Sequence, residues 1–133
     1  MSSIEFSGTN GKVNISDQVI SNIIGASVYE CYGVVGMASK NKFKDGVTDL
    51  LGKENYSKGI VVNIDENEIE IHIHVIVSYG VKVSEVARSI QERVKHQVET
   101  MLDIHVANVD VIVEDVRVQK DNEKDKDKSK PSL

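Results

Sequence analysis

Two histidines, His72 and His74, lie two residues apart, close to the acidic residues Glu68 and Glu70. Imidazole and carboxylate groups are among the ligands that zinc and copper sites use in proteins. Alternate residues of a strand point to the same face, so these four side chains could meet around a metal ion. The same spacing also describes the ordinary solvent-facing side of a strand, and no closing ligand is evident. We therefore favour an exposed polar face and expect no metal or other cofactor, with His72 and His74 as the candidate ligands if a metal binds.

A second motif with a chemical meaning is GVVG at residues 33–36. It has the GxxG form of the loop with which KH domains bind a nucleic-acid backbone. Such a loop normally lies between two helices and has polar or basic middle residues, whereas here the middle is Val-Val and a strand is expected to follow. We interpret the glycines as the end of a helix and a place where two backbone segments pass closely.

A basic cluster with an aromatic residue follows the GVVG motif. Its members are Lys40, Lys42, Phe43, Lys44, Lys53 and Lys58. Anionic lipid headgroups, an acidic protein or RNA could bind such a cluster, although a solvated loop also attracts charge without binding anything. The formal net charge of −5 argues against a protein that coats nucleic acid, because phosphate binding needs a dense basic surface. The cluster is the first part of our predicted interaction surface.

We find no residues arranged for nucleophilic catalysis. The single cysteine, Cys31, falls on the inward side of a predicted helix with Ile24 and Val28, where a thiol behaves as a small apolar side chain. It also has no partner for an internal disulfide. No serine has a histidine and an acid at a recognisable spacing. We therefore expect that the protein is not an enzyme.

Two amphipathic helices are predicted to position these groups. The first begins after Ser16, whose hydroxyl can cap a helix, and ends near Gly33. Its inward residues recur at steps of three and four: Val19, Ile20, Ile23, Ile24, Ser27, Val28 and Cys31. The second helix begins near Ser84 and runs to about Leu102. Its inward residues are Val86, Ile90, Val94, Val98 and Met101.

The strands are predicted from alternation of apolar and polar residues. Residues 60–64 and 69–77 alternate strictly on either side of a polar turn at 65–67, which indicates an antiparallel hairpin. Shorter strands are expected at 11–15 and 34–38, and the spacing of Val47, Leu50 and Leu51 indicates a short helix. A last strand carries Val109, Val111 and Val113, with a bulge or bend near Asn108 because the preceding apolar residues have the opposite parity.

These elements predict an α+β fold with two layers, a mixed β-sheet with two long amphipathic helices packed on one face. A chain of 133 residues with 40% hydrophobic content suits one globular domain. We expect an N-terminal extension at residues 1–10, the domain at 11–118, and a disordered tail at 119–133, where lysines alternate with acids. The first residues lack the pattern of a signal peptide and no stretch approaches a membrane span, so we expect a cytoplasmic protein without direct membrane insertion.

Four segments carry a resemblance to a known family. They are GKVNISDQVISNIIGASVYECYGVVGM at residues 11–37, LLGKENYSKGIVV at 50–62, VIVSYGVKVSEVARSIQERVKHQVETM at 75–101 and VANVDVIVEDV at 106–116. In this order and spacing the chain resembles the alkaline shock protein family, which includes the YloU-like proteins, over residues 4 to 118. The resemblance implies an α/β domain of cytoplasmic proteins from Gram-positive bacteria, linked to envelope stress. It also implies that some members are held at the membrane by a partner protein, and it carries over no catalytic residue.

From the resemblance we predict a non-enzymatic protein-interaction module in the cell-envelope stress response or homeostasis. Its partners would be proteins, including a membrane-anchored one, or further copies of the chain in a homo-oligomer. The second part of the predicted interaction surface is the outer face of the sheet, where Val61 and Ile76 would form a partly apolar patch. Two alternatives are an RNA-binding module, which would use the loop from Lys40 to Lys58 and the GVVG turn, and an accessory subunit of a soluble metabolic enzyme complex.

Overall fold

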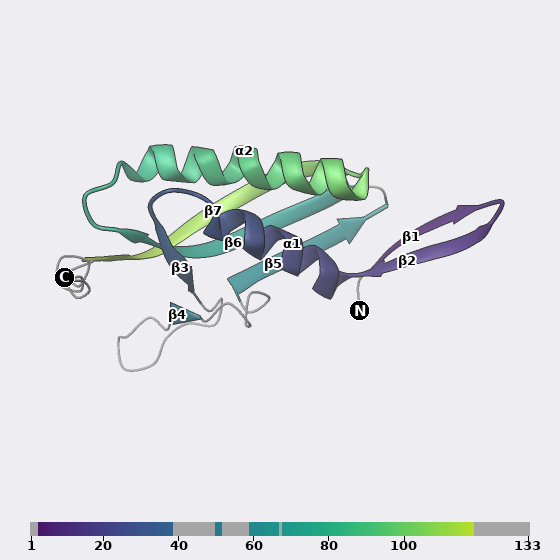
Figure 1. Cartoon of the computed structure of the whole chain (residues 1–133), viewed down its shortest axis with the longest axis horizontal. Coiled ribbons are helices and arrows are strands. Elements are labelled where there is room, and N and C mark those ends of the chain that lie inside the picture. Colours follow the sequence, from purple (N-terminus) through teal and green to yellow (C-terminus); the bar gives the residue numbers. More distant parts are fainter. Residues whose placement is uncertain (1–2, 39–49, 52–58, 67, 119–133) are drawn as a thin grey trace, which may run out of the picture.

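The computed structural model describes residues 3–38, 50–51, 59–66 and 68–118 of the chain. In this part of the chain, one helix follows the first two strands and a second helix precedes the last strand (Figure 1). Their order is β1 (Ser3–Gly8), β2 (Gly11–Ser16), α1 (Asp17–Tyr29), β3 (Val34–Ala38), β4 (Leu50–Leu51), β5 (Ile60–Asp65), β6 (Glu68–Ser78), α2 (Val83–Leu102) and β7 (His105–Arg117).

The main sheet is built around β6, which pairs with three strands. Along one edge it pairs with β7 in parallel, and along the other it pairs antiparallel with β5 over its first half and with β3 over its second half. The sheet is therefore mixed, and the predicted antiparallel hairpin of β5 and β6 is confirmed. Its alternation serves the core directly, because every odd-numbered residue of β6 from Ile69 to Val77 is fully buried.

Both helices contribute to the same hydrophobic core as these residues of β6. The core includes Ile20, Ile24 and Val28 from α1, and Val86, Ile90, Val94, Val98 and Leu102 from α2. The α+β class is confirmed, with α2 the longer helix at 20 residues and α1 only 13. Figure 1 shows α2 running along the length of the sheet.

Two residues predicted to be inward lie on the surface. Met101 is 59% exposed and Val19 is 44% exposed, while Leu102 is buried in place of Met101. The buried row of α2 advances by four residues at every step from Val86 to Leu102, and in a helix the neighbour of such a residue is turned about 100° away. The prediction for these two positions was wrong because a step of three and a step of four are both compatible with a helical stripe.

The N-terminal residues form a hairpin that the prediction did not contain. β1 pairs antiparallel with β2 as a separate two-stranded sheet, so the strand predicted at 11–15 exists but does not join the main sheet. The hairpin also crosses the expected boundary between residues 10 and 11. Figure 1 shows it projecting from one end of the molecule, directly before α1.

Two further expectations concern short segments. Leu50 and Leu51 form the strand β4, paired with β3 through Met37 and Ala38, and not the expected short helix; Val47 lies outside the described residues. Leucine spacing alone cannot separate a helical turn from a strand that finds a pairing edge. The bulge expected near Asn108 is confirmed, because the register of β7 against β6 shifts between Val106 and Asn108.

Candidate functional site

The predicted interaction surface is only partly described by the structure. Lys40, Lys42, Phe43, Lys44, Lys53 and Lys58 lie outside the described residues. Val61 is half-buried and lies beside His72 in the β5–β6 pairing. Ile76 is fully buried, so it cannot be the exposed apolar residue that we expected.

Residues of neighbouring strands, and not the pattern along β6, account for the burial of Ile76. By parity it belongs with His72 and His74, on the side of β6 opposite the main core. It lies where the register shifts against both adjacent strands, between Gly36 of β3 and Asp115 of β7. Periodicity along one strand assigns a face, but it does not show what covers that face at a given residue.

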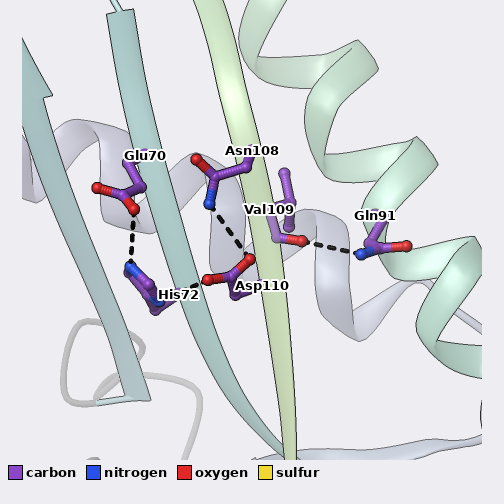
Figure 2. Close-up of polar contacts among 6 residues, drawn as sticks. All are labelled: Glu70, His72, Gln91, Asn108, Val109 and Asp110. Carbon is purple, nitrogen blue, oxygen red and sulfur yellow. Dashed lines mark hydrogen bonds and ion pairs between the residues drawn. The ribbon is translucent and has the colours of Figure 1, made fainter.

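The two histidines instead face acidic residues of β7. The Nδ1 of His72 lies 3.1 Å from a carboxylate oxygen of Asp110, its direct neighbour in the register, and its Nε2 lies 3.6 Å from Glu70 (Figure 2). Asn108 donates a hydrogen bond to the same Asp110 carboxylate group at 3.2 Å. These contacts form a small polar network on the outer face of the sheet.

His74 makes a tighter and more buried pair. Its Nδ1 lies 2.7 Å from Glu114 Oε2, and both side chains are largely buried. Glu114 has no counterpart in β6 because the register shifts between Val113 and Asp115, so it is the extra residue of a bulge. Bulges re-aim side chains, and here the bulge coincides with the carboxylate that contacts His74.

This arrangement separates the two imidazoles into different acid pairs. The predicted metal set of His72 and His74 with Glu68 and Glu70 is not brought together, since β7 supplies the carboxylates closest to the rings. Within the described residues, no group of three or more histidine, cysteine or acidic side chains is placed to hold a metal ion. The geometry favours a structural role in joining β6 to β7.

The GVVG turn is used for packing. α1 ends at Tyr29, and Gly33 adopts a φ of +92°, which an L side chain rarely adopts. A Cβ at Gly33 would lie 2.8 Å from Val86 Cγ2 of α2, and the Gly33 carbonyl accepts a hydrogen bond from Ser78 N–H at 2.9 Å. The expected close approach at this glycine is confirmed. Cys31, two residues earlier, is buried as expected and contacts the Ser27 carbonyl.

The free edge of β7 is the feature that sequence reasoning missed. Among the described strands only β6 pairs with β7, so the other edge presents backbone N–H and C=O groups. Glu99 Oε2 accepts the Val106 N–H at 3.0 Å, and Gln91 Nε2 donates to the Val109 carbonyl at 2.9 Å (Figure 2 shows the second contact). Side chains of α2 therefore cap the first part of this edge.

Farther along, the edge has no partner among the described residues. Backbone groups of alternate residues point to the same side of a strand, so Val111 and Val113 direct their N–H and C=O groups as Val109 does. In the part of the chain that the structure describes, no side chain caps these groups. The next edge-facing N–H, that of Val116, is taken by the side chain of Asp115 at 2.8 Å. The open segment thus spans Val111 to Val113, between two capped positions.

A signal for these caps is hard to find in the sequence. Gln91 lies 18 residues from Val109, and Glu99 lies seven residues from Val106, across the end of a helix. Spacing alone favours a surface pair of Glu99 with Lys95, because residues four apart on a helix are neighbours. Only the packing of α2 against β7 reveals the second use of this carboxylate.

The second notable surface is a shallow apolar groove on the two helices. It encloses about 320 Å³ and is lined by Val19, Asn22, Ile23, Ala26, Ser27 and Glu30 of α1 and its end, with Gln97 and Met101 of α2. Its charged lining residue, Glu30, already lies 3.1 Å from Arg93. Such a lining suits apolar contact more than acid–base chemistry.

Comparison with known proteins adds a family relationship. The sequence matches the alkaline shock protein 23 family, described as having a cell envelope-related function, over residues 5–118. It is 45% identical over 116 residues to the uncharacterized protein YloU of Bacillus subtilis, covering 87% of this chain and 97% of the relative. It is 42% identical over 119 residues to the uncharacterized protein Spy1614 of Streptococcus pyogenes, covering 90% and 98%.

A more distant relative carries a functional name. The stress response regulator gls24 homolog of Streptococcus pyogenes is 24% identical over 120 residues, which are 90% of this chain and 66% of that protein. In the described residues, no helix has both the length and the apolar character needed to cross a membrane.

Proposed function

Because the chain belongs to the alkaline shock protein 23 family, whose function relates to the cell envelope, we propose that it is a non-enzymatic module that binds an extended segment of a partner protein along β7. The observation that carries this proposal is the open segment from Val111 to Val113 between two capped positions of one strand edge. An exposed sheet edge is a recognition site for peptides that add as a further strand.

The size of the open segment limits what can bind. Val111 and Val113 together offer two N–H donors and two C=O acceptors, and each new hydrogen bond contributes about 0.5–1.5 kcal/mol net. Four such bonds alone give weak binding, so side-chain contacts must supply the remainder. Ile112 is half-buried on the polar face, and Val111 and Val113 lie at the border of the main core. The partner segment is therefore short and contributes apolar side chains on both faces.

The histidine and cysteine side chains, which could in principle take part in catalysis, favour an interaction module over a catalyst. The imidazoles of His72 and His74 are paired with carboxylates, and Cys31 is buried in the core. We propose that the protein lies in the cytoplasm. A membrane-anchored envelope protein would supply the strand that adds to β7 and would thereby hold the chain at the membrane.

A proline at the open edge tests the proposal. Val111→Pro removes the edge-facing N–H and should leave the ladder to β6 intact, since proline is tolerated on an edge where its nitrogen faces away from the sheet. Recovery of cross-linked partners with tagged protein from its own cells, measured by mass spectrometry, should fall roughly tenfold, because about one hydrogen bond is lost and the ring adds bulk.

The matched control is Val111→Ala, which shortens the same side chain and keeps the N–H. It should recover clearly more partner than Val111→Pro, because it loses part of one side-chain contact but no hydrogen bond, and circular dichroism should show both variants folded. Equal recovery with Val111→Pro and wild type would reject edge binding. Recovery of a soluble enzyme complex or a ribonucleoprotein in place of an envelope protein would favour the accessory-subunit or RNA-binding alternative.

A further inference from the structure

The β1–β2 hairpin has one apolar face and one polar face. Cross-strand partners share a face, so Ile4 with Ile15, Phe6 with Val13, and Gly8 with Gly11 make one side of the ribbon. This side carries no ionisable group. The opposite side holds Glu5 and Lys12, which form an exposed ion pair at 3.5 Å.

Only the root of the apolar face is covered. Ile4 is buried and Ile15 packs against the main core, whereas Phe6 is 38% exposed and Val13 is 56% exposed. The ribbon projects away from the rest of the molecule (Figure 1). A two-stranded hairpin without a packing surface is marginal in water. Its outer half therefore needs a surface that the same copy does not supply.

The helix groove is a surface of matching character near the hairpin root. It includes Val19, which lies in the first turn of α1 directly after β2, and Met101 in the last turn of α2. Figure 1 shows the start of α1 and the end of α2 at the side of the molecule from which the hairpin projects. The hairpin thus leads into α1 beside this groove, and none of the described residues that line the groove belongs to the hairpin.

From these observations we propose that two copies exchange hairpins, so that Phe6 and Val13 of each copy pack into the helix groove of the other. A two-fold arrangement satisfies both surfaces at once, because each copy donates one hairpin and receives one. Four large side chains that are exposed in the single copy would be covered: Phe6, Val13, Val19 and Met101. The exchange does not depend on the proposed edge binding at β7.

The charges are compatible with this occupant. The apolar face of the hairpin would bring no ionisable side chain into the groove, and the charged lining residue Glu30 is already paired with Arg93. The exchange therefore buries no unpaired charge, which would be costly. The Glu5–Lys12 pair would stay on the outer, solvated side of the hairpin.

The expected strength follows from the area. Each strand of the hairpin has six residues, so the ribbon is about 20 Å long and about 10 Å wide, and its outer half is about 10 Å long. Two exchanged outer halves and their two grooves bury roughly 400 Å² in total. This is below the roughly 1,200 Å² of typical stable complexes, which predicts a weak dimer that dissociates on dilution. We expect dissociation in the micromolar range in sedimentation experiments on the full chain.

Cross-linking between two different variants tests the contact directly. Chains with Phe6→Cys and chains with Met101→Cys are purified reduced, mixed, and oxidised under mild conditions. The mixture should form a covalent heterodimer at least about tenfold faster than Glu5→Cys mixed with Met101→Cys, because Glu5 lies on the opposite face of the same strand. Wild type, with only the buried Cys31, gives the background.

Sedimentation velocity provides an independent readout. Phe6→Ser and Met101→Glu should each weaken dimerisation at least about tenfold, while Glu5→Ser should leave it unchanged. Equal cross-linking of the Phe6→Cys and Glu5→Cys chains, or a wild-type chain that stays monomeric at several hundred micromolar, would overturn the exchange. Because Val111 is not part of either surface, Val111→Pro should retain the dimer, so a failure here and a failure of edge binding are distinguishable.

Discussion

The unpaired edge of β7 differs between the two halves of the strand. In the first half, the Val106 N–H and the Val109 carbonyl are bonded by Glu99 and Gln91 of α2, while no described side chain caps Val111 or Val113 in the second half. Near its start, α2 carries Glu85 and Arg88, whose side chains form an ion pair with each other at 3.2 Å. A helix that lies along an edge strand can thus protect part of it and leave a defined part for recognition.

The largest loss of stability is expected from a substitution in β6, the strand that pairs with both halves of β7. Ile73→Ala empties a fully buried position in the middle of β6, and such truncations cost about 2–5 kcal/mol. Urea unfolding followed by circular dichroism should show this loss, and both halves of β7 should lose protection together. Val61→Ala, at a half-buried position of β5, should cost clearly less. Equal losses for the two variants would contradict the assigned core.

A smaller loss of stability is expected from removing Glu99, the charged side chain that caps the Val106 N–H. Glu99→Ala leaves the Val106 N–H without its acceptor, which should cost about 1–3 kcal/mol. Amide hydrogen exchange should increase at Val106 and remain unchanged at Val111, sharpening the difference between the halves. Glu99 also lies 3.6 Å from His105, so His105→Ala is the control that removes this pair and keeps the cap. An equal increase at Val106 in His105→Ala would reject the capping role.

The smallest effect is expected at the neutral cap. Gln91→Ala removes the donor to the Val109 carbonyl, and a neutral hydrogen bond contributes about 1 kcal/mol. Gln91→Glu should cost more than Gln91→Ala, because a carboxylate offers no donor and faces the carbonyl oxygen. Urea midpoints of the two variants give the comparison, and a more stable Gln91→Glu chain would show that the contact is not a cap.

The sequence pattern was sufficient to predict those features that depend on a single helix or strand. The alternation of residues 69–77 assigned the buried face of β6, and the helical rows from Val86 to Val98 assigned that of α2. The change of parity before Val109 located a bulge that the pairing with β6 confirms. In each case a period of 2 or 3.6 is a local property of the chain.

Pattern failed where a second element decides. Leu50 and Leu51 form a strand because β3 offers an edge, and Ile76 is buried although its parity places it with the histidines. The candidate site depends on the same kind of information. No spacing in the sequence indicates that His74 meets Glu114 across 40 residues or that Gln91 reaches Val109.

The sequence by itself therefore determined the α+β class, the central hairpin, the two helices and the family. The tertiary structure alone decided which edge of β7 stays open, which acids face the histidines, and that the hairpin of β1 and β2 stands apart from the main sheet. The physical reason is that periodicity records how each segment buries its own side chains. Caps, ion pairs and free edges arise between segments, where distance in space is independent of distance along the chain.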